Sequence, residues 1–142
     1  MGKEYDPNYV PEKVYFQVGQ KALIIDNEGK ILFLKRSDKT GNKWSFPGGG
    51  LEKGKEAIES IKREIKEETD LDGADFQVFY IIAGGSKTGD AGIIIGYKCT
   101  STGKIELNWE HSEYKWLSPK DGLNLELSSH AKILLEQFLM TN

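Results

Sequence analysis

The sequence contains a single cysteine, Cys99, among its 142 residues. One cysteine cannot form a disulfide within the chain, and it cannot supply the cysteine cluster of a structural zinc site. We expect Cys99 to fill a buried position in a strand, and a nucleophilic thiol is the alternative. The scarcity of cysteine fits the reducing cytoplasm, which is the expected location.

Long apolar runs are also missing, and the richest stretch covers only residues 76–83. A membrane helix needs roughly 20 consecutive apolar residues, so we expect no spanning segment. Residues 1–12 form a polar lead-in that contains charges and prolines. Because this segment lacks the apolar core of a secretory signal, secretion is not expected either.

An excess of positive charge is the third absence, since 19 basic residues face 22 acidic ones and the formal net charge is -3. Strong binding to nucleic acid or to an anionic membrane needs concentrated positive charge. We therefore expect neither partner. The remaining composition is that of an ordinary globular protein, and we predict one domain over residues 1–142. The sequence leaves open whether the protein is a monomer or a homodimer.

Hydrophobic periodicity predicts an α/β fold, with a mixed sheet between helices on its two faces. Turn chemistry at residues 26–29 predicts a hairpin. One helix is expected over 56–69, with an apolar stripe that includes Ile61 and Ile65, and Ser128 or Ser129 is expected to cap a final helix. The expected buried stripe of that final helix is Ala131, Ile133, Leu134, Phe138 and Leu139. The expected strands are 14–17, 21–25, 31–34, 76–83, 91–100, 105–107 and 113–117.

A glycine-rich segment, 44–50, reads Trp-Ser-Phe-Pro-Gly-Gly-Gly. Glycine loses more backbone entropy on folding than any other residue, so three in succession are costly to order. We interpret the segment as a loop whose backbone takes unusual dihedral angles or approaches a ligand closely. A flexible turn is the alternative.

An acidic cluster at the end of the predicted helix is the most informative feature. Residues three and four apart share a helix face, so Glu64, Glu67 and Glu68 should project together, with Arg63 beside them. Carboxylates roughly 6 Å apart repel by about 3 kcal/mol per pair at an effective dielectric near 20. A hard divalent cation compensates such repulsion. A solvated Glu/Lys face is the alternative.

These features together resemble the Nudix box. The box reads Gly, five residues, Glu, seven residues, Arg-Glu, an aliphatic residue, any residue, Glu-Glu, any residue, Gly and an aliphatic residue. The match runs from Gly49 to Leu71 and includes the Arg-Glu-aliphatic trio and the Glu-Glu pair. Trp-x-Phe-Pro-Gly-Gly at 44–49 resembles the usual approach to the box, and 113–119 resembles a Glu-x-x-Trp strand found near the far end of these domains.

The resemblance implies a Nudix-type α/β/α sandwich. It also implies an enzyme that uses Mg²⁺, with Mn²⁺ as a substitute, to cleave a diphosphate linkage in a nucleotide-like small molecule. A water activated by the metal would attack phosphorus. The alternative is a catalytically weakened module that binds nucleotides or regulates. A structural protein with a merely charged helix is the third hypothesis.

The site residues follow from the same resemblance. Glu64 would bind a second ion or help to activate water, and Arg63 would orient the acidic pair. Glu110 would reach the metal or act as general base, with Glu113 as the fallback. The implied metal ligands are the Gly48 carbonyl, Glu64, Glu67, Glu68 and Glu110. The implied catalytic residues are Arg63, Glu64, Glu67 and Glu110, and the implied substrate contacts are Arg36, Phe46 and Gly49.

Two positions depart from the box. Lys55 stands where the first glutamate is expected, and this change motivates the alternative of a weakened enzyme. Glu56 lies one residue further on, which turns its side chain by about 100° around the helix. Asp70 stands where the last glycine is expected, and Asp tolerates the left-handed conformation at a helix end.

Overall fold

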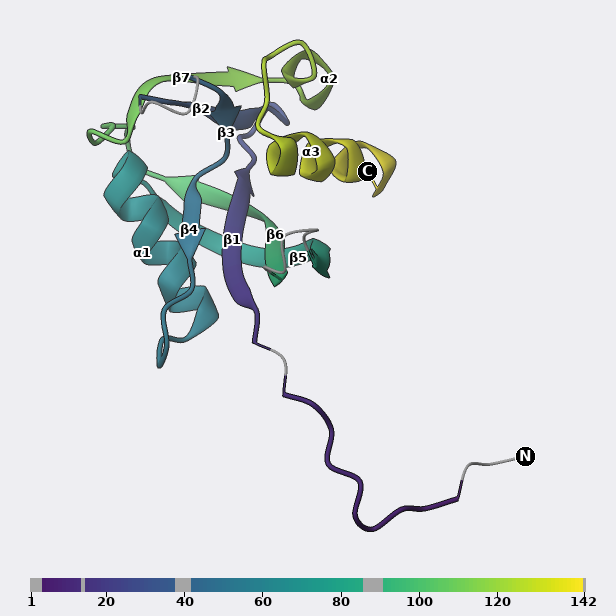
Figure 1. Cartoon of the computed structure of the whole chain (residues 1–142). Helices are drawn as coiled ribbons and strands as arrows, with labels where there is room; N and C mark the ends of the chain where they lie inside the picture. The colour runs from purple at the N-terminus through teal and green to yellow at the C-terminus, as the bar shows by residue number, and fades with distance from the viewer. Residues whose placement is uncertain (1–3, 14, 38–41, 86–90, 142) are drawn as a thin grey trace.

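The computed structural model describes residues 4–13, 15–37, 42–85 and 91–141, which form two β-sheets and three helices. The four-stranded sheet contains, in order, β4 (Gly48–Gly50), β1 (Gln17–Ile24), β6 (Ala91–Thr102) and β5 (Asp72–Gly85). The three-stranded sheet contains, in order, β3 (Trp44–Ser45), β2 (Ile31–Arg36) and β7 (His111–Leu117). The helices are α1 (Ala57–Thr69), the short α2 (Pro119–Gly122) and α3 (Ser129–Thr141) (Figure 1).

The larger sheet is mixed, as predicted. Strand β1 runs parallel to β6 and antiparallel to β4, and β5 is antiparallel to β6. The smaller sheet, which the sequence did not separate from the first, is antiparallel throughout. Residues 31–34 of β2 are buried without alternation, because this strand lies between apolar groups on both of its faces.

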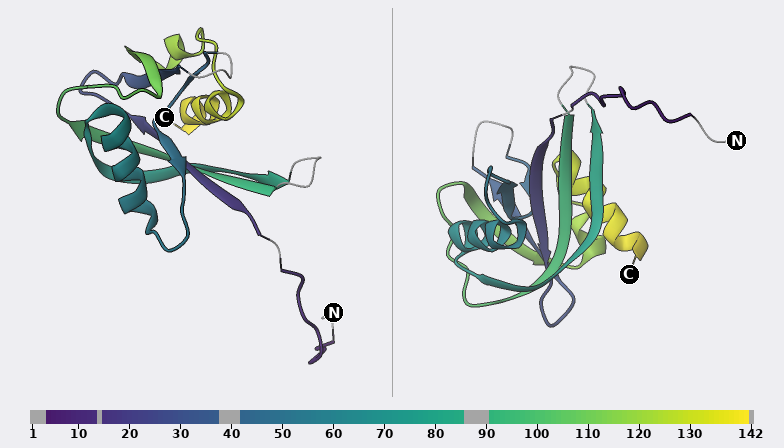
Figure 2. Two further views of the ribbon diagram at one scale, coloured as in Figure 1. Left: turned by 60° about the vertical axis from the view of Figure 1, so that its left-hand side comes forward. Right: turned by 90° about the horizontal axis from the view of Figure 1, so that it is seen from below.

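Side chains that alternate along β1 divide the interior into two clusters. Ala22 and Ile24 belong to the cluster that contains Ile61 of α1, whereas Leu23 belongs to the cluster that contains Leu134 of α3. All five side chains are fully buried. The views in Figure 2 show α1 and α3 on opposite faces of the sheet. The predicted α/β/α sandwich is confirmed.

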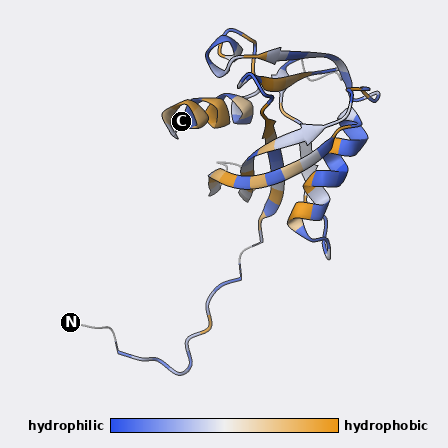
Figure 3. Cartoon of the chain, turned by 180° about the vertical axis from the view of Figure 1, so that it is seen from behind, coloured by the Kyte–Doolittle hydropathy of each residue, from blue (hydrophilic) through white to orange (hydrophobic). Residues whose placement is uncertain are grey.

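The two long helices differ in composition. Figure 3 shows α1 mainly in the colours of polar residues and α3 largely in those of apolar residues. Ser128 caps α3, because its Oγ accepts a hydrogen bond from the Ala131 N–H at 3.4 Å. The buried residues of α3 are Ala131, Leu134, Leu135 and Phe138. The prediction for Ile133 and Leu139 was wrong, since these side chains are 39% and 36% exposed.

The predicted hairpin forms its turn but not its ladder. The Asp26 N–H donates to the Lys30 carbonyl at 2.9 Å, and Asp26 Oδ1 accepts from the N–H groups of Glu28 and Lys30. Beyond a single bridge between Ile25 and Ile31, the strands on either side enter different sheets.

The glycine-rich segment forms two short strands, β3 and β4, rather than the predicted loop. Residues 84–85, expected in a loop, extend β5, and the rest of that loop, 86–90, lies outside the described residues. Val14 and residues 38–41 also lie outside them. Residues 105–107 form no strand, and α2 was not predicted.

Cys99 is 3% exposed and belongs to the cluster beneath α1. Burial raises the pKa of its thiol to about 12, so the thiol stays protonated at neutral pH. The expectation of a buried filler is confirmed. No helix that the structure describes combines the length and the apolar character needed to cross a membrane.

Candidate active site

The site is built where α1 meets the glycine strand β4. The Gly48 N–H donates a hydrogen bond of 3.0 Å to Glu68 Oε2, and the Glu68 side chain is almost completely buried. Gly48 has a φ of 156°, and a Cβ there would overlap the carbonyl of Gln20 on β1. Only glycine therefore lets β4 pair with β1 and present its amide to the helix.

The next glycine accommodates a second carboxylate. A Cβ on Gly49 would lie 2.9 Å from the carboxyl carbon of Glu64, so the side chain of Glu64 occupies the space that a larger residue would fill. The Glu64 side chain is 17% exposed. Burial, the largest effect, raises the pKa of this carboxyl, and Arg63 opposes that rise.

Glu67 lies on the outer side of the same helical turn. Its Oε1 accepts a hydrogen bond of 2.9 Å from Arg63, and half of its side chain is exposed. Arg63 also lies 3.4 Å from Glu64 Oε1. The guanidinium thus bridges Glu64 and Glu67, and of the Glu67-Glu68 pair that it was predicted to orient, it contacts Glu67.

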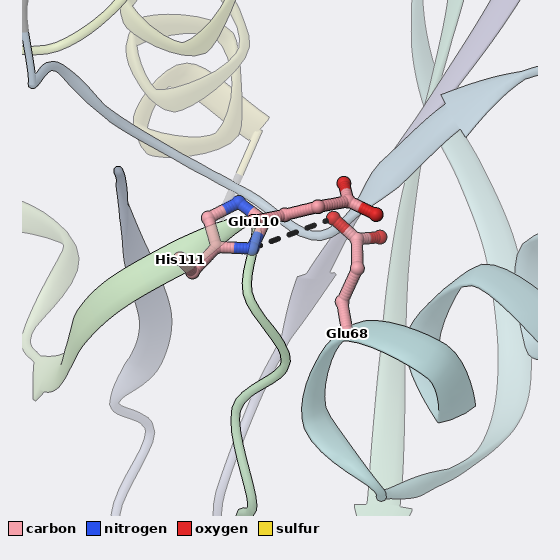
Figure 4. A group of neighbouring side chains, drawn as sticks. All are labelled: Glu68, Glu110 and His111. Atoms are coloured by element: carbon pink, nitrogen blue, oxygen red, sulfur yellow. Dashed lines mark ion pairs between the residues drawn. The ribbon is translucent and has the colours of Figure 1, made fainter. Parts of the chain in front are cut away.

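Glu110, which directly precedes β7, and His111, the first residue of β7, approach Glu68 (Figure 4). The three side chains each place a ligand atom within 4.8 Å of the others, and His111 Nδ1 lies 3.7 Å from Glu68 Oε1. Both Glu68 and His111 are buried. Two carboxylates and an imidazole at this spacing can surround one metal ion.

Backbone hydrogen bonds hold Glu110 in place. Its N–H donates to Asn108 Oδ1 at 3.1 Å, and its carbonyl accepts from the Ser37 N–H at 3.0 Å. The Glu106 N–H donates to the carbonyl of Thr69, at the end of α1. This last contact explains why residues 105–107 do not form the predicted strand, since their backbone bonds to a helix end.

Burial dominates the electrostatics of Glu68 and raises the pKa of its carboxyl to about 8. Lys21 and the Gly48 N–H oppose this rise, whereas Glu110 and Glu64 add to it. Carboxylates that are forced together in a buried place suit a divalent cation, which neutralises their charge. The donor set present therefore fits the metal that the sequence implies.

Comparisons with known proteins agree with this geometry. A family model described as the NUDIX domain matches residues 16–138. The chain belongs to the Nudix family.

Membership makes this chain a Nudix pyrophosphohydrolase that acts on acid anhydrides of phosphorus compounds. Among curated relatives, nucleoside triphosphatase NudI of Escherichia coli is 29% identical over 119 residues, which cover 74% of this chain and 84% of the relative.

Solved structures share the fold. The MutT protein of Methanosarcina mazei is 26% identical, with a TM-score of 0.74 over 89% of this chain and 95% of that one. The ORF135 protein of E. coli is 22% identical, with a TM-score of 0.79 over 88% and 89% of the two chains.

The structure brings most of the predicted site residues of this Nudix chain together, although their roles stay predictions. Arg36, at the end of β2, pairs in register with His111 and so lies beside the Glu68 cluster. Glu113, the fallback, lies 4.0 Å from Lys35 and is not part of that cluster.

Phe46 lies differently from the prediction. Its side chain is fully buried in the cluster beneath α3 and packs against Phe33, with ring centroids 5.2 Å apart. Only its backbone reaches the site, where its carbonyl accepts a hydrogen bond from Lys21. A substrate contact through the Phe46 side chain is not available in this packing.

Two residues of the site were missed. His111 was given no role from the sequence, although imidazole is a common metal ligand. Lys21 begins the expected strand 21–25, and the available signal was a lysine followed directly by the apolar residues Ala22, Leu23 and Ile24.

The residues at and beside the two departures from the box lie at the two ends of α1. Glu56 caps α1, because its carboxylate accepts hydrogen bonds from the N–H groups of Ile58 at 3.2 Å and Glu59 at 2.8 Å. Lys55 is exposed beside this cap. Asp70 ends the helix at a φ of 62°, in the left-handed region, as expected.

Proposed function

We propose that this Nudix protein is a Mg²⁺-dependent hydrolase, with Mn²⁺ as a substitute. Its substrate is a nucleoside triphosphate or a nucleoside diphosphate derivative, and a diphosphate linkage is cleaved by water attack on phosphorus. The buried carboxylate of Glu68, which faces Glu110 and His111, carries this proposal. A carboxylate in that position needs a cation to stay ionised.

The proposed ligands are the Gly48 carbonyl and the carboxylates of Glu64, Glu67, Glu68 and Glu110. When bound, the metal lowers the pKa of a water and neutralises phosphate charge. The protein contributes the fixed positions: the Gly48 N–H holds Glu68, the Gly49 backbone leaves room for Glu64, and Arg63 joins Glu64 to Glu67.

The proton acceptor is a carboxylate of the site. Glu110 has the better placement, because Asn108 and Ser37 fix its backbone beside Glu68. Glu64 is the second candidate, because burial raises the pKa of its carboxyl and so makes it a better proton acceptor. Arg36, next to His111 in register, would contact phosphate.

Relatives support the substrate class. NudI of E. coli and of Shigella flexneri is named as a nucleoside triphosphatase. Among solved structures with the same fold is a dihydroneopterin triphosphate pyrophosphohydrolase of E. coli, which is 23% identical. A triphosphate ester whose organic part carries a planar heterocycle is therefore the first class to assay.

The test is hydrolysis of a panel of nucleoside triphosphates and dinucleotide-like diphosphates with Mg²⁺, with identification of the products. We expect at least one substrate to be cleaved and the cleavage to stop in EDTA. Metal-independent turnover, or no turnover across the panel, contradicts the proposal. Size-exclusion chromatography and cellular fractionation test the accompanying expectations of one domain, monomer or homodimer, in the cytoplasm.

A further inference from the structure

Lys21 is the only charged residue of β1 and lies among the buried positions of that strand. It is followed by three fully buried apolar residues and is itself only partly exposed. An ammonium group loses solvation in such a place, and the loss costs stability unless charged or polar partners compensate it. Its position therefore points to a role at the site.

The backbone places Lys21 at the centre of that site. It pairs in register with Gly48, whose N–H holds Glu68. Its Nζ donates a hydrogen bond of 3.2 Å to the carbonyl of Phe46. An ammonium group has three donors, and this is the only hydrogen bond that the described residues give it.

Lys21 is surrounded by three carboxylates and by one other cation, Arg36. Burial lowers the pKa of Lys21, the carboxylates of Glu68, Glu64 and Glu110 raise it, and Arg36 lowers it again. Lys21 and Arg36 are therefore close enough to repel each other, and three acids are close enough to compensate them. Without metal, Lys21 and Arg36 offset part of the negative charge of the three acids.

A divalent ion changes this balance. Once the carboxylates bind the ion, the ion offsets their negative charge. The positive charges of Lys21 and Arg36 are then less well balanced than before. An anion that arrives beside the ion restores the balance. The phosphate oxygens of the substrate are that anion, and an ammonium group binds them as a compact point charge.

We propose that Lys21 is a substrate-binding residue that donates to a phosphate oxygen and holds the phosphoryl group against the metal-binding carboxylates. This inference rests on the proposed function, because it needs a phosphorylated substrate at the same site. It assigns a binding role to a residue that lies outside the box and outside the predicted site.

The experiment compares Lys21→Met, Lys21→Gln and Lys21→Arg with the wild type. Glutamine can still donate to the Phe46 carbonyl but carries no charge, so it separates the hydrogen bond from the phosphate contact. Lys98→Met, which removes a partly buried lysine from the neighbouring strand β6, is the matched control. Thermal melting establishes that each variant is folded.

Two binding measurements are made on each variant. The first is calorimetric titration with an imido analogue of ATP in the presence of Mg²⁺, and the second is Mn²⁺ binding without nucleotide, followed by electron paramagnetic resonance. We expect Lys21→Met and Lys21→Gln to bind the analogue about 10- to 100-fold more weakly. Their Mn²⁺ affinity should be unchanged or tighter, because a cation has left the site. Lys21→Arg and Lys98→Met should stay within about threefold of the wild type.

Wild-type affinity for the analogue in both uncharged variants overturns the inference. So does a parallel loss of Mn²⁺ binding, which would show that Lys21 only supports Glu68. If Lys21→Met does not fold, the glutamine variant decides by the same criteria. A wild type that hydrolyses no nucleotide and binds none contradicts the proposed function itself, whereas active wild type with an unaffected glutamine variant contradicts this inference alone.

Discussion

The inner and outer sides of the last two turns of α1 carry the same residue type in very different surroundings. Glu68 and Glu64 face the glycine strand, with side chains that are 2% and 17% exposed, whereas half of the Glu67 side chain is exposed. Neighbours in sequence thus differ because one step along a helix turns a side chain by about 100°. The Glu-Glu pair supplies two environments rather than one.

Glu68 and Glu67 also differ in their hydrogen-bond partners and in the energetic weight of those interactions. Glu68 accepts a backbone N–H from Gly48, and burial raises its pKa to about 8. Glu67 meets the exposed guanidinium of Arg63. Exposed ion pairs contribute little, at about 0.2–1 kcal/mol, while a buried carboxylate without its cation is costly. The inner side is therefore where metal removal and substitution should have their largest effects.

The sharpest test of this contrast is Glu68→Gln. We expect hydrolysis to fall by about 10³-fold or more, because losing the buried ligand removes several kcal/mol of transition-state stabilisation. The amide can still accept from the Gly48 N–H, so the fold should survive. Steady-state kinetics with the best substrate and circular dichroism provide the measurement. Turnover within tenfold of the wild type would remove Glu68 from the centre of the mechanism.

A pH titration of stability tests the inner side without any kinetics. The folded-state pKa of Glu68, about 8, lies above its ordinary value of 4.5, so between these values the folded chain binds more protons than the unfolded chain. The stability of the metal-free protein should therefore fall as pH rises through this window and level off above it. Thermal melts in EDTA between pH 5 and pH 9 would show the slope.

Mg²⁺ and Glu68→Gln should each reduce that slope, Mg²⁺ because it compensates the ionised carboxylate and glutamine because it cannot ionise. The stabilisation by Mg²⁺ should accordingly be greater at pH 8 than at pH 6. An equal slope in the wild type and in Glu68→Gln, both in EDTA, would assign the pH dependence to another group.

Substitution of Glu67, on the outer side of α1, should reduce turnover less than substitution of Glu68. Glu67→Gln removes the charge that pairs with Arg63 and weakens the proposed metal binding, and we expect turnover to fall by about 10- to 100-fold. The melting temperature should hardly change, since the pair is exposed. Arg63→Lys is the companion variant, because it keeps the positive charge but loses the two guanidinium nitrogens that contact Glu64 and Glu67. A larger loss of turnover in Glu67→Gln than in Glu68→Gln would show that the exposed carboxylate matters more to catalysis than the buried one.

Sequence reasoning succeeded where a local rule decides the structure. The apolar stripe predicted α1, and Ile61 and Ile65 are fully buried in it. The left-handed conformation of Asp70 followed from its residue type at a helix end. The sandwich followed from the order of strands and helices, together with the resemblance to the Nudix box.

Failures arose where the partner of a segment lies far away in the sequence. Segment 44–50 forms strands because β1 and β2 pair with it, and glycine content alone cannot show such partners. Residues 105–107 bond to the end of α1 instead of joining a sheet. The burial of Phe46 and the position of Lys21 likewise depend on which strand faces which, so neither was predicted.

The start of α1 offers the smallest expected effects and tests the departure from the box. Glu56→Ala removes the carboxylate that caps Ile58 and Glu59, and we expect a loss of about 1 kcal/mol in the free energy of unfolding. Lys55→Glu should change stability by less than about 0.5 kcal/mol, because the side chain is exposed. Urea unfolding measures both changes, and turnover of Lys55→Glu should stay within about threefold of the wild type. A large gain of turnover in Lys55→Glu would instead show that the lysine weakens this enzyme, and the inner acids of α1 would then depend on the loop before the helix as well as on the glycine strand.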